Sequence, residues 1–248
     1  MKYLGSIIFG LLFAFNSFSI DSLFNQGVES LYNEDFESAQ AYFEVDVSQS
    51  PSFSSFYNLG VASGKLEQWD KAKWAFESAL KYKPMNGDAQ YNASFATTQI
   101  NPGVEWTHPY PWIERIIFGF GFNLWIVMAV LSSIVIGVLL FLILARRKSI
   151  NKTKKWCLRL LVPVSIVFLV SMYGIQKLNN HFNSERFAIV KSQEVVFYIS
   201  PNGMEIDEKP VKAQRFYIEN FFKDSTWVQV RSQKNNLMWI KHENLYIY

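Results

Sequence analysis

Two long apolar blocks in the second half of the chain limit what it can fold into. Residues 116–145 carry no charged side chain, and the stretch LWIVMAVLSSIVIGVLLFLILA at 124–145 lacks the polar stripe of a soluble helix. As a helix, that stretch is long enough to cross about 30 Å of hydrocarbon. A second block at 158–176 carries only Arg159, whose long side chain can reach the interface. The blocks predict transmembrane helices over 122–145 and 157–176.

A basic segment separates the two blocks. RRKSINKTKK at 146–155 contains six Lys and Arg residues and no acid, although the net charge of the chain is only +3. Because short loops rich in Lys and Arg stay in the cytoplasm, we expect loop 146–156 inside and both flanking regions outside. A nucleic-acid site is disfavoured, since the loop offers little surface and no interleaved aromatic residues, while weak contact with anionic lipid stays open. The topology would be determined by Arg146, Arg147, Lys148, Lys152, Lys154 and Lys155.

The first residues have the organisation of a secretory signal peptide. Lys2 precedes the apolar stretch YLGSIIFGLLFAF, and Ser17 and Ser19 supply the small residues of a cleavage site after position 19. An uncleaved anchor helix is the alternative, and either segment predicts export of the residues from Ile20 onward. Cys157 is the single cysteine, so an intramolecular disulfide cannot support the exported parts.

A sequence motif recurs with an offset of 33 residues in the region after position 20. Small residues in the motif let two antiparallel helices approach closely, large apolar residues fill the space between them, and a proline ends the second helix. The pattern resembles the tetratricopeptide repeat, with Phe56 in place of the usual Trp. It predicts repeats over 20–52 and 53–85 and a capping helix over 86–100. The repeat-packing residues are Gly27, Ala39, Phe43, Pro51, Leu59, Gly60, Ala72, Phe76, Ala79 and Pro84.

The tetratricopeptide resemblance implies a concave groove, lined from the first helix of each repeat, that binds a protein partner. The implied groove residues are Phe24, Val28, Tyr57, Val61, Gln90 and Ser94. Burial of Phe24 and Val28 beneath their neighbours is an equally supported alternative. The Lys and Asn pattern that clamps a carboxylate terminus in chaperone-binding repeats is absent from these positions, which disfavours a chaperone-tail receptor. Two repeats and a cap bury little apolar surface, so we expect them to dock on the membrane or a partner.

The end of the chain has β-strand character. Linkers are expected at 101–121, which includes an interfacial segment, and at 177–185. Residues 186–248 then contain alternating β-branched and aromatic runs interrupted by PNG and KNN, which predicts about five short strands. Their layout resembles the bacterial SH3-type barrel, although Met238 replaces a usual glycine. The candidate ligand ledge of this domain is Tyr198, Tyr217, Trp227 and Trp239. The favoured alternative places Trp227 and Trp239 in the core, because they alternate with Val228, Val230 and Ile240.

No catalytic, cofactor-binding or metal-binding residue is predicted. The sequence contains no nucleophile elbow, phosphate-binding loop or cluster with metal-ligand spacing, and His108, His181 and His242 are isolated from one another. The predicted fold class is therefore a multidomain membrane protein without an active site: tetratricopeptide hairpins, a two-helix transmembrane hairpin and an SH3-like barrel.

The order of these parts resembles the BatE family of the Bacteroides-type aerotolerance (Bat) operon. The resemblance implies a bacterial inner-membrane protein with both larger domains in the periplasm and a role in aerotolerance or envelope stress. It also implies protein partners, membrane-anchored von Willebrand A-domain proteins among them, that a non-enzymatic adaptor binds through its repeats. The alternative is a membrane-tethered protein that binds or senses peptidoglycan through its SH3-like barrel.

Overall fold

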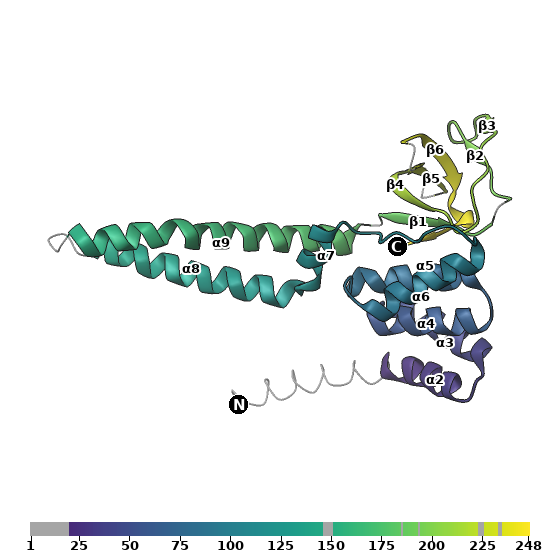
Figure 1. Cartoon of the computed structure of the whole chain (residues 1–248), viewed down its shortest axis with the longest axis horizontal. Helices are drawn as coiled ribbons and strands as arrows, with labels where there is room; N and C mark the ends of the chain where they lie inside the picture. The colour runs from purple at the N-terminus through teal and green to yellow at the C-terminus, as the bar shows by residue number, and fades with distance from the viewer. Residues whose placement is uncertain (1–19, 146–150, 185, 193, 223–225, 233–234) are drawn as a thin grey trace, which may run out of the picture. The chain divides into compact units, whose positions relative to one another are not determined.

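A computed structural model describes residues 20–145, 151–184, 186–192, 194–222, 226–232 and 235–248. These residues form two compact units (Figure 1). Of these described residues, those up to Pro109 pack with those after Ser184, and those between Tyr110 and Ser184 form the second unit. The expected signal peptide, the topology residues Arg146, Arg147 and Lys148, and the side chain of Lys152 lie outside the described part of the chain.

From residue 20 to residue 100 the first unit consists of five helices arranged as consecutive hairpins. Three of the helices have side-chain caps of the type that favours helix initiation: Asp35, Ser52 and Asn86 each accept a hydrogen bond from a backbone N–H three residues later. The helices are α2 (Ile20–Tyr32), α3 (Phe36–Gln49), α4 (Phe53–Lys65), α5 (Trp69–Tyr82) and α6 (Gly87–Ile100).

The first two hairpins share the same local geometry. Their turns contain Glu34 and Glu67, with φ angles of 59° and 58°, at positions 33 residues apart. In each turn the next residue donates a backbone hydrogen bond of 2.9 Å to a carbonyl of the preceding helix, from Asp35 to Ser30 and from Gln68 to Ser63. The sequence offset therefore corresponds to a repeated backbone conformation.

The glycines of the repeated motif lie where the paired helices approach most closely. A Cβ atom on Gly27 would lie 2.8 Å from the Phe43 ring, and one on Gly60 would lie 2.7 Å from the Phe76 ring. The other predicted packing residues, Ala39, Leu59, Ala72, Ala79 and Pro84, are buried. Pro51 is exposed and follows the end of α3, in agreement with its predicted role of ending that helix, but it does not pack in the core.

The second unit contains two helices that are long and apolar enough to cross a membrane. They are α8 (Gly121–Ala145) and α9 (Asn151–Asn183), which lie side by side, and α7 (Trp112–Gly119) precedes them (Figure 1). Gly121, at the α7–α8 junction, has a φ of +67°, a conformation that favours glycine. Trp125 of α8 packs against Gly174 of α9, where a Cβ atom would lie 2.6 Å from the indole.

Helix α9 is longer than the apolar block that predicted it. It includes residues 151–156 of the expected loop and continues to Asn183, through most of the expected linker at 177–185. Two contacts support this extension: Lys177 forms a 3.1 Å ion pair with Glu114 of α7, and the His181 ring stacks on Phe118 at 3.9 Å.

The remainder of the first unit is an antiparallel sheet of seven strands within the described residues, where about five were expected. The strand order is β3-β2-β6-β5-β4-β1-β7. A short 3-10 helix, His242–Asn244, precedes the last strand. The strands are β1 (Phe187–Val190), β2 (Phe197–Tyr198), β3 (Glu205–Ile206), β4 (Arg215–Phe222), β5 (Trp227–Arg231), β6 (Leu237–Lys241) and β7 (Leu245–Ile247).

The core of the sheet contains one of the two residue sets that alternate along β5 and β6. Val228, Val230 and Ile240 belong to the buried apolar cluster, together with Phe197 and Phe216. Trp227 and Trp239 alternate with these residues and therefore lie on the opposite face of the sheet. The favoured expectation is correct for the burial of Trp227, which is 6% exposed and packs on Tyr198. Trp239 is only half-buried, and neither tryptophan belongs to the apolar cluster.

Candidate functional site

The outer face of α5 is covered by the chain's own β-sheet. Trp74 donates a 3.1 Å hydrogen bond from Nε1 to the carbonyl of Ile247, and its indole stacks on Tyr246 with ring centroids 5.2 Å apart. Lys73 donates a 2.8 Å hydrogen bond from Nζ to the carbonyl of Ala213. The docking that the sequence led us to expect from a membrane or partner thus occurs within one chain.

A buried carboxylate lies at the centre of this contact. Glu77 of α5 is fully buried (0% exposed). Its Oε1 accepts a 2.8 Å hydrogen bond from Nε1 of Trp106, and its Oε2 accepts one from the hydroxyl of Tyr248. Nη1 of Arg215 lies 3.3 Å from the same Oε2. The carboxylate of this helical residue therefore has partners from the segment after α6, from the sheet and from the residue that follows its last strand.

The titration behaviour of the neighbouring cations follows from this burial. Burial is the main reason why the pKa of Lys73 lies below its usual value, and Arg215 lowers it further while Glu77 opposes the change. Burial also tends to lower the pKa of Arg215, but Glu77 and Tyr248 outweigh it, so that the pKa is raised. Arg215 also donates from Nη2 to the carbonyl oxygen of Thr107 at 2.6 Å. These groups bind one another, which gives the cluster a structural role.

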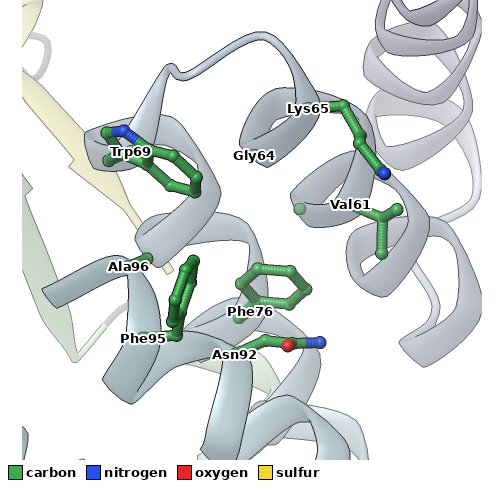
Figure 2. Close-up of a pocket in the computed structure, with 9 residues that line it drawn as sticks. Val61, Gly64, Lys65, Trp69, Phe76, Asn92, Phe95 and Ala96 are labelled. Carbon is green, nitrogen blue, oxygen red and sulfur yellow. The ribbon is translucent and has the colours of Figure 1, made fainter. Parts of the chain in front are cut away.

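The concave side of the helices contains an apolar hollow of about 300 Å³. Helix α4 contributes one wall, the first half of α5 the base, and α6 the other wall. In Figure 2, Phe76 lies at the centre, with Trp69 and Phe95 on one side and Val61 and Lys65 on the other. The lining residues are Gly60, Val61, Gly64, Lys65, Trp69, Phe76, Asn92, Phe95 and Ala96.

Aromatic side chains extend the hollow onto the surface of α6. Phe95 packs edge-on against Trp69 with ring centroids 5.7 Å apart and stacks on Tyr91 at 6.5 Å. Tyr91 is 70% exposed and Phe95 is 45% exposed, although both are large apolar residues. Exposed aromatic residues beside an apolar hollow are typical of a surface that binds another molecule.

The structure places the predicted groove residues in different surroundings. Val61 lines the hollow, and Tyr57 lies beside it, where it packs on Phe76 at 5.6 Å and accepts a 3.1 Å hydrogen bond from Asn92. Gln90 donates its side-chain hydrogen bond to the carbonyl of Pro84, and Ser94 is half-buried.

Phe24 and Val28, for which burial beneath neighbouring side chains was the alternative to the groove, differ from each other. Phe24 packs on Phe43 with ring centroids 5.8 Å apart, so it contributes to the core, whereas Val28 is exposed.

Sequence reasoning missed six residues of the hollow, because the implied groove was limited to a few positions of the first helices. The missed residues are Gly64, Lys65, Trp69, Asn92, Phe95 and Ala96. Trp69 begins a second helix and lies in the hollow because α5 crosses its base. The available sequence signal was the pair Tyr91 and Phe95, which lie four residues apart on one face of a short helix with no following partner helix in the repeat frame.

The sheet brings together three of the four predicted ledge residues. Tyr198 packs edge-on against Trp227 at 5.0 Å, and Tyr198 pairs with Trp239 across β2 and β6. Tyr217 is separate from them: it lies on β4 and contacts Phe187 at 5.1 Å. Beside Trp227 the surface has a hollow of about 660 Å³, lined by Lys191, Asn202, Thr226, Trp227, Lys241, His242, Glu243 and Leu245.

The histidines have structural contacts in three separate places. His108 makes a 2.9 Å hydrogen bond with the carbonyl of Pro84, His181 is surrounded by Phe118, Phe182 and Tyr110, and His242 borders the hollow beside Trp227. Within the described ranges, no three His, Cys, Asp or Glu side chains are grouped so that they could hold a metal ion.

No protein-family model matches the sequence, and neither the curated proteins nor the solved structures include a match.

Proposed function

We propose that this protein is a non-enzymatic, membrane-anchored adaptor that binds a protein partner in the concave face of its helical hairpins. One observation carries the proposal: the concave hollow is open and has exposed aromatic residues at its edge, whereas the outer face of α5 is closed by the sheet. A partner approaching the α4–α6 region therefore has one apolar surface to bind. The tetratricopeptide resemblance supports the same surface.

The membrane part of the proposal is that α8 and α9 anchor the adaptor, with both flanking parts in the periplasm. Helix α6 precedes the two apolar helices and β1 follows them, yet α2–α6 and the sheet form one unit. Two parts of one folded unit occupy the same side of a membrane, which supports a hairpin that crosses it twice. The basic segment before α9 supports the cytoplasmic side for the connection. We also propose that the sheet is an SH3-like barrel and that the chain is a member of the BatE family. Von Willebrand A-domain proteins are then the candidate partners.

The test compares partners captured by mild crosslinking in cells. Removal of the helices would expose Arg215 and the apolar surface beneath α5, so point variants are preferable to a deletion. The double variant Tyr91→Ala with Phe95→Ala removes exposed side chains at the hollow. The matched control is Tyr32→Ala with Val45→Ala, which removes exposed apolar side chains from α2 and α3. We expect the first variant to lose at least one partner that the control retains; identical partner sets would refute the adaptor function at this surface.

A second candidate function is recognition of peptidoglycan by the sheet. The hollow beside Trp227 combines an aromatic wall with polar side chains from Asn202, Thr226 and His242, a combination suited to sugars and peptides. The full chain in detergent should then sediment with purified peptidoglycan. His242→Ala, which removes an exposed side chain that lines the hollow, should weaken this binding, while Tyr217→Ala, on another part of the sheet, should not. A full chain that stays in the supernatant would exclude this function.

A further inference from the structure

We propose that the concave hollow receives one large apolar side chain of a linear peptide that also carries a carboxylate next to that side chain. This inference rests on the proposed adaptor function and defines the chemistry of its partner. Three features of the hollow carry it: its size and aromatic walls, one cationic side chain at its edge, and one amide oxygen available to a peptide N–H.

The size and lining of the hollow suit a single anchoring side chain. Its volume of about 300 Å³ lies at the lower end of the range for ligand pockets. Trp69, Phe76 and Phe95 supply aromatic surface, and a buried aromatic or aliphatic anchor commonly dominates the affinity of such contacts. Gly64 leaves space in the wall: a Cβ atom there would lie 3.5 Å from Trp69, an ordinary van der Waals distance.

The charge at the edge of the hollow comes from Lys65. It is the one charged side chain among the lining residues, and within the described residues no carboxylate forms an ion pair with it. Its ammonium lies 5.7 Å from the ring centroid of Phe36. Other lysines of the helices already have partners, since Lys71 pairs with Glu44 and Lys73 is buried. An acidic side chain beside the anchor would therefore find an available cation.

The amide of Asn92 favours a peptide over a lipid or another purely apolar ligand. Its Nδ2 donates to the hydroxyl of Tyr57 at 3.1 Å, which leaves the Oδ1 atom of this lining residue as an acceptor for a ligand. A peptide backbone offers N–H donors along its whole length. Figure 2 shows Asn92 beside Phe76, so a peptide N–H bonded to Asn92 would carry its side chain close to the aromatic walls.

The test is selection of a random linear-peptide display library on the full chain in detergent. The expected peptides contain Trp, Phe, Tyr, Leu, Ile or Met with Asp or Glu within a few positions. Gly64→Leu should fill the hollow and weaken the selected peptides at least about tenfold, whereas Gly64→Ala should bind them nearly as the unmodified chain does. Phe95→Ala removes an exposed wall residue and should weaken them too, which keeps the test decisive if Gly64→Leu does not fold.

The charge requirement has its own matched pair of variants. Lys65→Glu should weaken the acidic peptides about tenfold and shift a new selection towards basic peptides. Lys83→Glu is the control, because Lys83 also lies over an aromatic ring, Phe53 at 4.6 Å, but does not line the hollow. Synthetic peptides with Asn or Gln in place of the acid should also lose affinity for the unmodified chain, and Lys65→Glu should no longer weaken their binding.

Three results would overturn the inference: no enriched peptide, enriched peptides that bind Gly64→Leu and Phe95→Ala unchanged, or binding that is indifferent to Lys65→Glu. Failure here is distinguishable from failure of the adaptor function. If crosslinked partners depend on Tyr91 and Phe95 while no acidic, apolar-anchored peptide is selected, the adaptor function stands and the linear-peptide chemistry is wrong.

Discussion

Glu77 is the residue on which the contact between the helices and the sheet most depends. Its charge is balanced by Arg215 and Lys73, and both cations are largely removed from water. Glu77→Gln keeps the shape but leaves two buried cations without a carboxylate. We expect a loss of about 3 kcal/mol in the free energy of unfolding, as for other broken buried ion pairs. Denaturant unfolding of the full chain in detergent, followed by tryptophan fluorescence, measures this loss.

A matched control separates the effect of burying an ion pair from the effect of removing a charge. Glu219→Gln breaks the 2.7 Å pair between Glu219 and Arg231 on the surface of the sheet, and we expect little change in stability. Equal effects of the two substitutions would contradict the role assigned to the buried cluster.

Little in the sequence indicates this cluster. Lys73 and Glu77 are four residues apart on one helix, a spacing usually typical of a solvent-exposed ion pair. Their burial depends on Arg215 and Tyr248, which are distant in sequence and come from the sheet. Local patterns cannot identify such partners, because the charge balance arises only after the two parts of the chain have packed.

Tyr246 provides a prediction about alkaline stability. Burial, aided by Asp70 and Glu44, raises the pKa of Tyr246 from 10.0 to about 12. Because the folded pKa is raised, the folded state keeps the proton while the unfolded state loses it, so this contribution to stability is complete below about pH 10 and is lost as pH rises through about 12. Tyr246→Phe should therefore show a smaller loss of stability over that interval than the unmodified chain.

Denaturant midpoints at the two ends of this pH interval measure the effect. Tyr217→Phe is the control, because that side chain is 48% exposed on β4. The explanation fails if Tyr246→Phe and the unmodified chain lose stability in parallel.

At the scale of elements, two glycines of α4 differ in how closely the side chains of α5 approach them. At Gly60 a Cβ atom would lie 2.7 Å from Phe76, whereas at Gly64 the nearest atom would be 3.5 Å away. Gly60→Ala should lower the free energy of unfolding by about 1–3 kcal/mol through overpacking. Gly64→Ala should be neutral or raise it by up to about 1 kcal/mol, because alanine favours a helix more than glycine does. Thermal unfolding of both variants tests the difference, and destabilisation by Gly64→Ala equal to that by Gly60→Ala would contradict it.

The elements themselves were predictable to different degrees. The offset of 33 residues located the hairpins because each close approach needs a glycine at a fixed position, as at Gly27 and Gly60. The apolar blocks located α8 and α9, but the end of α9 depends on contacts of Lys177 and His181 with α7, which have no periodic signal. Alternation in β5 and β6 identified two faces without indicating which one is buried, since the answer depends on the neighbouring strands.

The same limit applies to the candidate site. The resemblance to tetratricopeptide repeats indicated the concave face and named Val61, which lines the hollow. It did not name Trp69 or Phe95, because those residues meet only through the packing of α5 and α6. Likewise, the aromatic residues of the sheet were recognised as a set, but the position of Tyr217 on β4 separates it from the others.

At the scale of the whole molecule, the two apolar helices lie in the sequence between two parts of the chain that fold together. The sheet covers α5 through Trp74, Lys73 and Glu77, so the helical hairpins and the sheet cannot lie on opposite sides of a membrane while this contact exists. The number of crossings between them must then be even, as it is for a hairpin of α8 and α9.

Site-directed labelling tests this topology directly. In a Cys157→Ser background, Glu67→Cys, in the turn between α4 and α5, and Glu205→Cys, on β3, each place one exposed thiol in a different part of the first unit. Both should react with a membrane-impermeant maleimide in vesicles of the same orientation, and Lys154→Cys, near the start of α9, should react only in vesicles of the opposite orientation. Reaction of the Glu67 and Glu205 variants from opposite sides would contradict the packed unit. Reaction of all three variants from one side would show instead that α8 and α9 do not carry residue 154 across the membrane.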